Sequence, residues 1–146
     1  MRSLVLCTVA LALAFAGCVG VRSGPGEAIE PFESVAATEW RIVAVGEVVP
    51  AEPMEPLELR FELSESRVSG STGVNRFFGT FERSGETLRF RPLAMTRRAG
   101  PPEAMALEAS LVGAFEAVRG WRATATELRL LDGGGDVLVR CEPAMR

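Results

Sequence analysis

The segment Leu57–Leu63 alternates strictly between apolar and charged residues. This alternation is typical of a β-strand that buries one face and exposes the other. Turn-forming residues recur at intervals of about ten residues, a spacing that favours an antiparallel meander. The other segments expected to form strands are Trp40–Val45, Arg67–Gly70, Phe77–Arg83, Thr87–Arg91, Trp121–Ala125, Glu127–Leu131 and Val137–Glu142.

A helical pattern follows the double proline Pro101–Pro102, from about Glu103 to Val118. Its apolar residues recur at the spacing of a helix with one buried stripe. Pro102 suits the first turn of a helix, and Gly120 suits a position just beyond its end. A single stripe predicts one amphipathic helix packed on the sheet, which makes the fold class α+β. The stripe consists of Leu107, Leu111, Ala114, Phe115 and Val118, widened by Met105 and Val112.

Residues 1–17 are typical of a bacterial export signal. Arg2 precedes the uncharged apolar run Leu4–Ala16, which is shorter than the roughly 20 residues of a membrane-spanning helix. The sequence Phe15-Ala16-Gly17-Cys18 resembles a bacterial lipobox, with Phe15 where that motif prefers Leu. The resemblance implies removal of residues 1–17 and lipidation of Cys18, and an ordinary secretory signal peptide is the alternative. By analogy with enteric bacteria, Val19 favours an outer-membrane lipoprotein facing the periplasm.

The segment that follows Cys18 is rich in Gly, Pro, Glu and Ala and shows no periodicity. Such a composition is typical of a flexible tether. We therefore divide the chain into a signal peptide (residues 1–17), a lipidated cysteine with its tether (18–37), and one folded domain (38–146). In this interpretation the protein meets the membrane through its lipid.

The composition removes several chemical options. The chain contains no His, which takes away the commonest general base and the commonest metal ligand. A formal net charge of −3 without a basic stripe argues against nucleic acid as a partner. The carboxylates Glu62, Glu65 and Glu82 lie beside strands, but their spacing specifies no catalytic pair. We predict no enzymatic activity, no cofactor and no metal site.

Two other groups of residues have ordinary structural explanations. Cys141 lies in the strand Val137–Glu142 and is expected to be a small buried residue, because no His is present to make it a nucleophile. Asp132 and Asp136 flank three glycines but lack the additional oxygen ligands of a calcium loop. A plain hairpin turn is therefore expected there.

The segment Ser69–Gly79 combines three glycines with an Asn and two adjacent aromatics. In a structural interpretation, Asn75 bonds main-chain groups, one aromatic enters the core, and Gly70, Gly73 and Gly79 take special dihedral angles. In a functional interpretation, this segment and the nearby arginines form a recognition surface for a carboxylate or another envelope protein. The candidate residues of that surface are Asn75, Arg76, Phe77, Phe78, Arg97 and Arg98.

Several motifs, in order, resemble the META domain family of bacterial envelope proteins, which includes the heat-shock protein HslJ. The motifs are Trp40 at the start of the first strand, Val68–Gly79, Pro92–Pro101 and the helical Met105–Glu108. The resemblance implies a small α+β domain in which one helix packs on a curved antiparallel sheet. It also implies a secreted or lipid-anchored protein, linked to stress or antibiotic tolerance, for which no catalytic residues are established.

The chain departs from the family pattern at Val74 and Gly100, where relatives usually have Cys. The loss of both together implies a disulfide in those relatives. We therefore predict that Val74 and Gly100 are neighbours here, with Cα atoms within about 7 Å.

Two functions are compatible with these observations. The first is a non-enzymatic, lipid-anchored envelope protein that serves stress or antibiotic tolerance by binding other envelope proteins. The alternative is a carrier of a small apolar ligand, which requires a sizeable cavity lined by the sheet.

Overall fold

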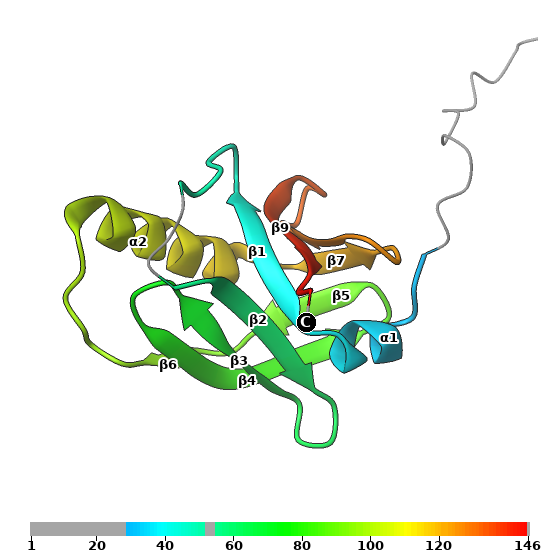
Figure 1. The fold of residues 1–146 in the computed structure, drawn as a ribbon. Coiled ribbons are helices and arrows are strands. Elements are labelled where there is room, and N and C mark those ends of the chain that lie inside the picture. Colours follow the sequence, from blue (N-terminus) through cyan, green and yellow to red (C-terminus); the bar gives the residue numbers. More distant parts are fainter. Residues whose placement is uncertain (1–28, 52–54, 146) are drawn as a thin grey trace, which may run out of the picture.

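Nine antiparallel strands and two helices form the described part of the chain, residues 29–51 and 55–145 of a computed structural model (Figure 1). Eight strands pair in the order β3-β2-β1-β9-β8-β7-β5-β4, and β4 pairs again with β3, which closes the sheet into a barrel. The ninth strand, β6, also pairs with β4. The elements are α1 (Phe32–Ala37), β1 (Trp40–Val45), β2 (Leu57–Glu62), β3 (Arg67–Thr72), β4 (Arg76–Ser84), β5 (Thr87–Phe90), β6 (Ala94–Met95), α2 (Pro102–Ala117), β7 (Gly120–Ala123), β8 (Leu128–Leu131) and β9 (Val137–Pro143).

The structure confirms the antiparallel sheet and the long helix that the sequence predicts, and it adds the closure of the sheet. Closure depends on pairings between distant parts of the chain, namely β1 with β9 and β5 with β7. A closed barrel leaves few unpaired backbone groups along its edges. The alternation of apolar and polar residues shows which face of a strand is buried, but not which strand lies beside it. The sequence therefore predicts a curved meander and does not predict its closure into a barrel.

A chain of touching aromatic rings runs through the barrel from one helix to the other. Phe32 of α1 contacts Phe61 with ring centroids 5.2 Å apart, and Phe61 stacks on Phe90 at 6.1 Å. Phe90 contacts Phe115 of α2 at 5.2 Å, and Phe115 contacts Phe77 at 5.1 Å. We call these five residues the aromatic column. Since each such pair adds about 0.5–1.5 kcal/mol beyond the area it buries, the column ties both helices to the barrel.

The N-terminal boundary of the domain differs from the prediction. The sequence predicts a flexible tether over residues 18–37, but its last six residues form the helix α1 at one end of the barrel (Figure 1). Phe32 and Val35 are each only 1% exposed, and the indole Nε1 of Trp40 donates a 2.8 Å hydrogen bond to the Val35 carbonyl. The guanidinium of Arg83 lies over the Phe32 ring. Two apolar anchors are too few to show a helical period, which is why the sequence pattern missed α1.

The predicted signal peptide, Cys18 and the first part of the tether fall within residues 1–28, outside the described residues. Those predictions therefore stay predictions. Among the described residues, no helix combines the length and the apolar character needed to span a bilayer.

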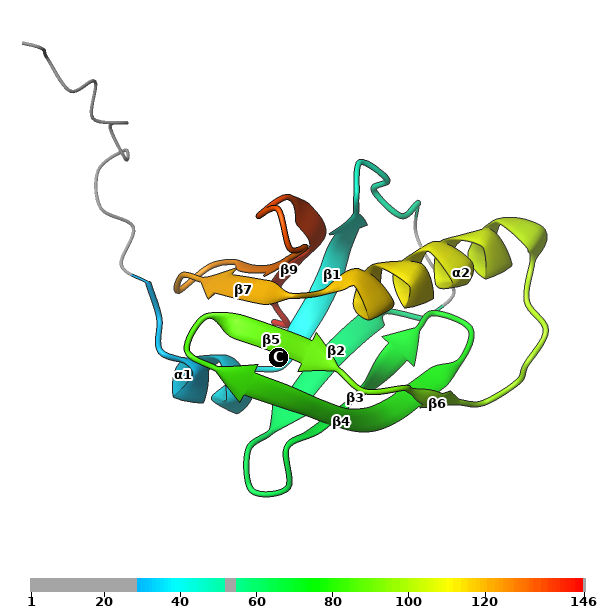
Figure 2. The same cartoon turned by 180° about the vertical axis from the view of Figure 1, so that it is seen from behind.

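Helix α2 confirms the predicted stripe and lies at the opposite end of the barrel from α1 (Figure 2). Leu111 and Phe115 are buried, and Val118 is buried immediately after the helix ends. Leu107 and Ala114 are partly buried against the same core. The helix begins with Pro102, where the missing proline N–H would have no helical partner in any case.

Strands β5 and β6 behave as one strand interrupted by a bulge. Phe90 pairs with Phe81 and Met95 pairs with Phe77, so five steps along β5–β6 correspond to four along β4. The extra residue falls around Pro92, which cannot donate a ladder hydrogen bond. The sequence pattern breaks from residue 93 onward, and β6 is therefore absent from the predicted strands.

We predict that Phe32→Ala destabilises the chain from residue 18 onward by about 3–5 kcal/mol, because it empties a fully buried aromatic site. Phe78→Ala is the matched control, since Phe78 is 56% exposed and its loss leaves no cavity. Denaturant unfolding followed by tryptophan fluorescence measures both. Equal stability of the two variants would show that α1 does not belong to the folded core.

Candidate functional site

The turn between β3 and β4 is tighter than the loop expected from Ser69–Gly79. The Thr72 N–H donates to the Asn75 carbonyl at 2.8 Å, which leaves only Gly73 and Val74 in the turn. Gly73 has φ +85°, the sign that a type II′ turn needs at its first central position.

The other two glycines of this segment have a different role from the one predicted. Gly70 and Gly79 are absent from the positive-φ region, so they do not supply special dihedral angles. At Gly70, a Cβ atom would lie 1.9 Å from the Glu58 carbonyl oxygen and 2.6 Å from the Phe77 ring. Gly70 is therefore required because the Glu58 carbonyl of β2 and the Phe77 ring both occupy the space that a side chain would need.

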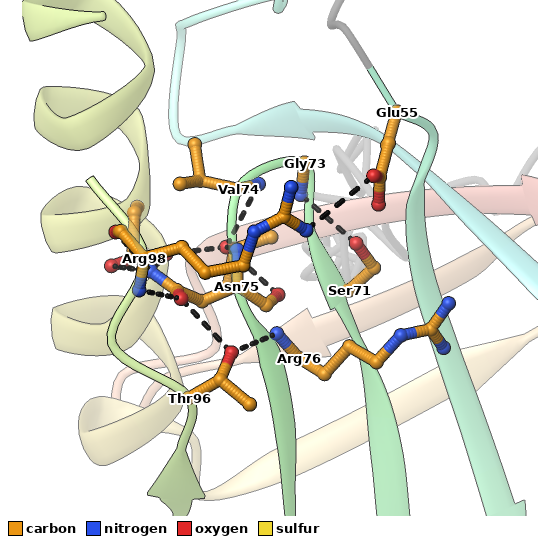
Figure 3. Close-up of polar contacts among 10 residues, drawn as sticks. Glu55, Ser71, Gly73, Val74, Asn75, Arg76, Thr96 and Arg98 are labelled. Carbon is orange, nitrogen blue, oxygen red and sulfur yellow. Dashed lines mark hydrogen bonds and ion pairs between the residues drawn. The ribbon is translucent and has the colours of Figure 1, made fainter. Parts of the chain in front are cut away.

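The side chain of Asn75 is the centre of a buried polar network (Figure 3). Its Oδ1 accepts hydrogen bonds from the Thr96 hydroxyl at 2.9 Å and from the Arg98 N–H at 2.7 Å. Its Nδ2 donates to the Arg98 carbonyl at 3.2 Å and to the Glu108 carboxylate at 3.0 Å. We call Asn75 and these partners, together with Thr72, the Asn75 network. It joins the β3–β4 turn, the connection before α2, and α2 itself, and it confirms that Asn75 bonds main-chain groups.

Glu108 is the residue of this network that sequence reasoning missed. Its carboxylate accepts the Thr72 hydroxyl at 2.5 Å as well as the Asn75 amide. Since the single Thr72 hydroxyl hydrogen points to Glu108, the Thr72 oxygen is free to accept the Asn75 N–H at 2.9 Å. Hydrogen bonds to a carboxylate are stronger than neutral ones. Its position in the sequence could have identified it. Glu108 lies on the same helix face as the buried Leu111 and Phe115, and a carboxylate on a buried face needs a hydrogen-bond partner.

The structure brings only part of the predicted recognition surface to the outside. Asn75 and Phe77 are each 2% exposed and cannot contact a partner, whereas Phe78 is 56% exposed. The expectation that one of the two adjacent aromatics enters the core is thus confirmed. Successive residues of a strand point to opposite faces, and Phe77 takes the inner one.

The arginines of the predicted surface are all exposed but do not form one cluster. Arg98 pairs with Glu55 at 3.6 Å, and Figure 3 shows the Arg76 side chain extending away from this pair. Within the described residues, Arg76 and Arg97 make no ion pair. Of the predicted surface, Phe78, Arg76 and Arg97 are therefore exposed, whereas Arg98 is also exposed but is paired with Glu55.

Phe78 stands in a row of side chains on the outer face of the barrel. It pairs with Ser69 of β3, which in turn pairs with Arg60 of β2. The guanidinium of Arg60 is shared between Glu39 at 3.4 Å and Glu58 at 3.6 Å. An open depression of about 720 Å³ follows this row. Its outward-facing side chains are Arg60, Glu62, Arg67, Ser69, Phe78 and Thr80.

Val74 and Gly100 lie in contact, which confirms that they are neighbours. A Cβ atom added to Gly100 would lie 3.5 Å from the Cβ of Val74 and 2.9 Å from its nearer methyl group. The Cβ–Cβ separation is at the short end of the range that a disulfide requires, about 3.5–4.5 Å. In this chain, van der Waals contact between Val74 and Gly100 takes the place of the disulfide that the resemblance implies in relatives.

Cys141 and the Asp132–Asp136 turn, for which the sequence analysis expected structural roles, have surroundings that suit those roles. Cys141 is fully buried, and this burial, together with the negative charge of Glu127, raises the pKa of its thiol. It therefore stays protonated at neutral pH and is a poor nucleophile. Asp132 closes its own turn, because its Oδ1 accepts the N–H groups of Gly134 at 2.8 Å and Asp136 at 2.9 Å.

We predict that the double variant V74C/G100C forms a disulfide and gains about 3–4 kcal/mol of stability over its reduced form, because the bond closes the segment that runs from the β3–β4 turn through β4, β5 and β6 to the residues before α2. Thiol counting and denaturant unfolding with and without reductant measure this. The single variants V74C and G100C are the controls and gain nothing on oxidation. Two thiols that stay free under oxidising conditions would contradict the geometry.

Solved structures share this fold. An NMR structure of a protein from Burkholderia xenovorans has a TM-score of 0.62 and 21% identity, covering 86% of this chain and 99% of that one. A second NMR structure has a TM-score of 0.61 and 22% identity, covering 76% and 92%. A crystal structure of a DUF4847 family protein from Bacteroides vulgatus has a TM-score of 0.57 and 12% identity, covering 80% and 99%. At these identities the likeness shows the fold alone.

No curated protein matches the chain. The model of the META domain, by contrast, matches residues 33–144, from within α1 to just past the end of β9. This range contains the closed barrel, the Asn75 network and the aromatic column apart from Phe32. Because it covers more than half of the sequence, the chain belongs to the META domain family.

Proposed function

We propose that this protein is a non-enzymatic lipoprotein of the bacterial cell envelope, anchored in the outer membrane through Cys18, that supports stress or antibiotic tolerance by binding another envelope protein. Membership of the META domain family supports the envelope role, since proteins of that family are secreted or lipid-anchored. The lipobox-like sequence that ends at Cys18 supports the anchor. No nucleic acid or cofactor enters this proposal.

The exposure of Phe78 carries the protein-binding part of the proposal. A large aromatic residue in the middle of a strand is exposed here although its neighbours Phe77 and Phe81 are buried. Aromatic and Arg side chains are enriched at the centres of protein interfaces. Phe78 lies on a strand paired on both sides, with β3 and β6, so it is held in place without a partner. The backbone at Phe78 therefore needs no ordering on binding, which lowers the entropic cost.

The charges around Phe78 indicate the kind of surface that a partner would present. Arg76 precedes it on β4, and Arg97 follows the segment that pairs with β4; neither is neutralised by an ion pair within the described residues. A partner with an apolar side chain flanked by carboxylates matches this arrangement. Such binding weakens as salt concentration rises, because exposed charges are screened.

Site-specific photocrosslinking in growing cells tests this surface. We predict that a photoreactive phenylalanine at position 78 gives an adduct with one defined envelope protein, and that Arg76→Glu reduces its yield. The matched control is the same probe at Val137, which is 39% exposed on β9, four strands away in the closed barrel. The same adducts from both positions, or none from either, would overturn the proposed interface.

Metabolic labelling tests the anchor separately. We predict that a clickable palmitate analogue labels the wild-type protein and the Cys141→Ser variant equally, because Cys141 is fully buried. Cys18→Ser abolishes the label. Label that persists in Cys18→Ser would show that the lipid is attached elsewhere, and an unlabelled wild-type protein would favour the ordinary secretory signal peptide.

A second candidate function, carriage of a small apolar ligand, is favoured by one observation. The barrel axis is occupied by the aromatic column, but a cavity of about 350 Å³ lies between α2 and the β5–β6 strand. This volume is within the range of small-molecule sites, about 300–1,000 Å³. The cavity is lined by the helix as well as the sheet, in contrast to the purely sheet-lined site that the sequence suggests.

A further inference from the structure

Among the described strands, the join between β5 and β7 is the shortest in the barrel. The two strands share a single register pair, Thr87 with Gly120. Two hydrogen bonds accompany it, from the Leu88 N–H to the Arg119 carbonyl and from the Trp121 N–H to the Glu86 carbonyl, each 3.1 Å long. Figure 2 shows that β5 then leads towards β6, whereas the chain on the other side is α2, so the two diverge. We call this widening gap the seam.

The cavity of about 350 Å³ occupies the seam. Phe90 and Phe115 of the aromatic column, whose rings are in contact, both line it. The bulge around Pro92 turns Leu93 to the inner side, where a Cβ on Gly79 would meet a Leu93 methyl at 2.7 Å. Bulges commonly re-aim side chains beside binding sites. The apolar side chains that line the cavity are Phe90, Leu93, Met95, Val112 and Phe115.

Two charged residues stand at the rim of the cavity, and they differ in what they already bind. The guanidinium of Arg91 donates to the carboxylate of Glu82. The carboxylate of Glu116 makes no ion pair or hydrogen bond within the described residues. The nearby Arg119 is engaged with backbone, because its guanidinium donates to the carbonyls of Glu116 and Val118 at 2.8 and 2.7 Å. Within the described residues, Glu116 is therefore the lining charge that has no partner of opposite sign.

We propose that the seam cavity binds a small cationic amphiphile, with an aromatic or other apolar body between α2 and the bulged strand and one ammonium group at Glu116. This inference rests on the second candidate function and specifies its site and ligand class. Phe90 is only partly buried and offers its ring for an edge or stacked contact, and the partly buried Met95 thioether adapts to irregular apolar shapes. The ammonium group stays at the rim, where it keeps part of its hydration while pairing with the carboxylate.

The test compares three probes that share one apolar body and differ in charge: phenylbutylamine, phenylbutanol and phenylbutyrate. Each is titrated into the chain from residue 18 onward, carrying Cys18→Ser, and binding is followed by methyl NMR. We expect the amine to bind most tightly and to shift the methyl signals of Leu93, Met95 and Val112. The carboxylate is expected to bind most weakly.

Two variants on α2 separate the charge from the cavity. Glu116→Gln is expected to lower the affinity for the amine by about threefold to fivefold, to the level of the alcohol. Glu103→Gln is the matched control, an exposed acid on the same helix outside the cavity, and leaves all three affinities unchanged. Val112→Phe fills the cavity and is expected to weaken all three probes. Unchanged signals from residues at the α1 end would show that this variant keeps its fold.

The outcomes distinguish failure of the cation preference from failure of the ligand-carrier function on which the inference rests. If the three probes bind the cavity equally and Glu116→Gln has no effect, the preference for a cation is wrong but an apolar ligand site remains. If phenylbutyrate binds best, the charge assignment is reversed and the inference fails. If no probe shifts the cavity methyl groups at its solubility limit, the inference and the ligand-carrier function both fail.

Discussion

Contact between the rings of Phe90 and Phe115 holds the barrel together where its hydrogen bonds stop. Strands β5 and β7 pair only at Thr87 and Gly120. Beyond that pair, the remaining residues of β5 do not pair with β7. An open edge would expose unpaired backbone groups to water and to other chains. Helix α2 covers the edge, and its Phe115 meets Phe90 at 5.2 Å. Closure at the seam is thus a matter of side-chain packing, and packing leaves space where hydrogen-bonded strands would not.

For α2 to cover the seam, the connection that leads into it must be held, and two contacts do this at the β3–β4 turn. The Asn75 network fixes the backbone of Arg98 and the carboxylate of Glu108, and Val74 packs against Gly100. Each hydrogen bond to a charged group contributes about 1.5–3 kcal/mol. In relatives the resemblance implies a disulfide in place of the second contact. A network that satisfies every polar atom of the Asn75 amide explains how this chain keeps the same connection without that bond.

The sequence predicted the elements whose evidence is local. Leu57–Leu63 shows the period of a half-buried strand, and the Leu107–Val118 stripe shows the period of a helix; both are confirmed. The sequence did not predict helix α1, because the contacts that bury Phe32 come from rings on the distant strands β2, β4 and β7. The Asn75–Glu108 contact joins residues 33 positions apart, and barrel closure joins β1 to β9. Helical spacing could mark Glu108 as an acid on the buried face of α2, but it could not identify Asn75 as the partner, and nothing in nearby residues indicates that β1 pairs with β9.

The same reasoning explains why the adjacent residues Phe77 and Phe78 have to be considered separately. The pleat of β4 sends Phe77 inward, where it contacts Phe115 and requires a glycine at position 70. Its identity is therefore accounted for by packing. Phe78 faces outward at 56% exposure and makes no ring contact within the described residues. Folding gives no reason for an aromatic residue there, since a polar residue would be better solvated on that face. A feature that the fold does not require is the kind that recognition can explain, and this is the physical case for placing a partner at Phe78.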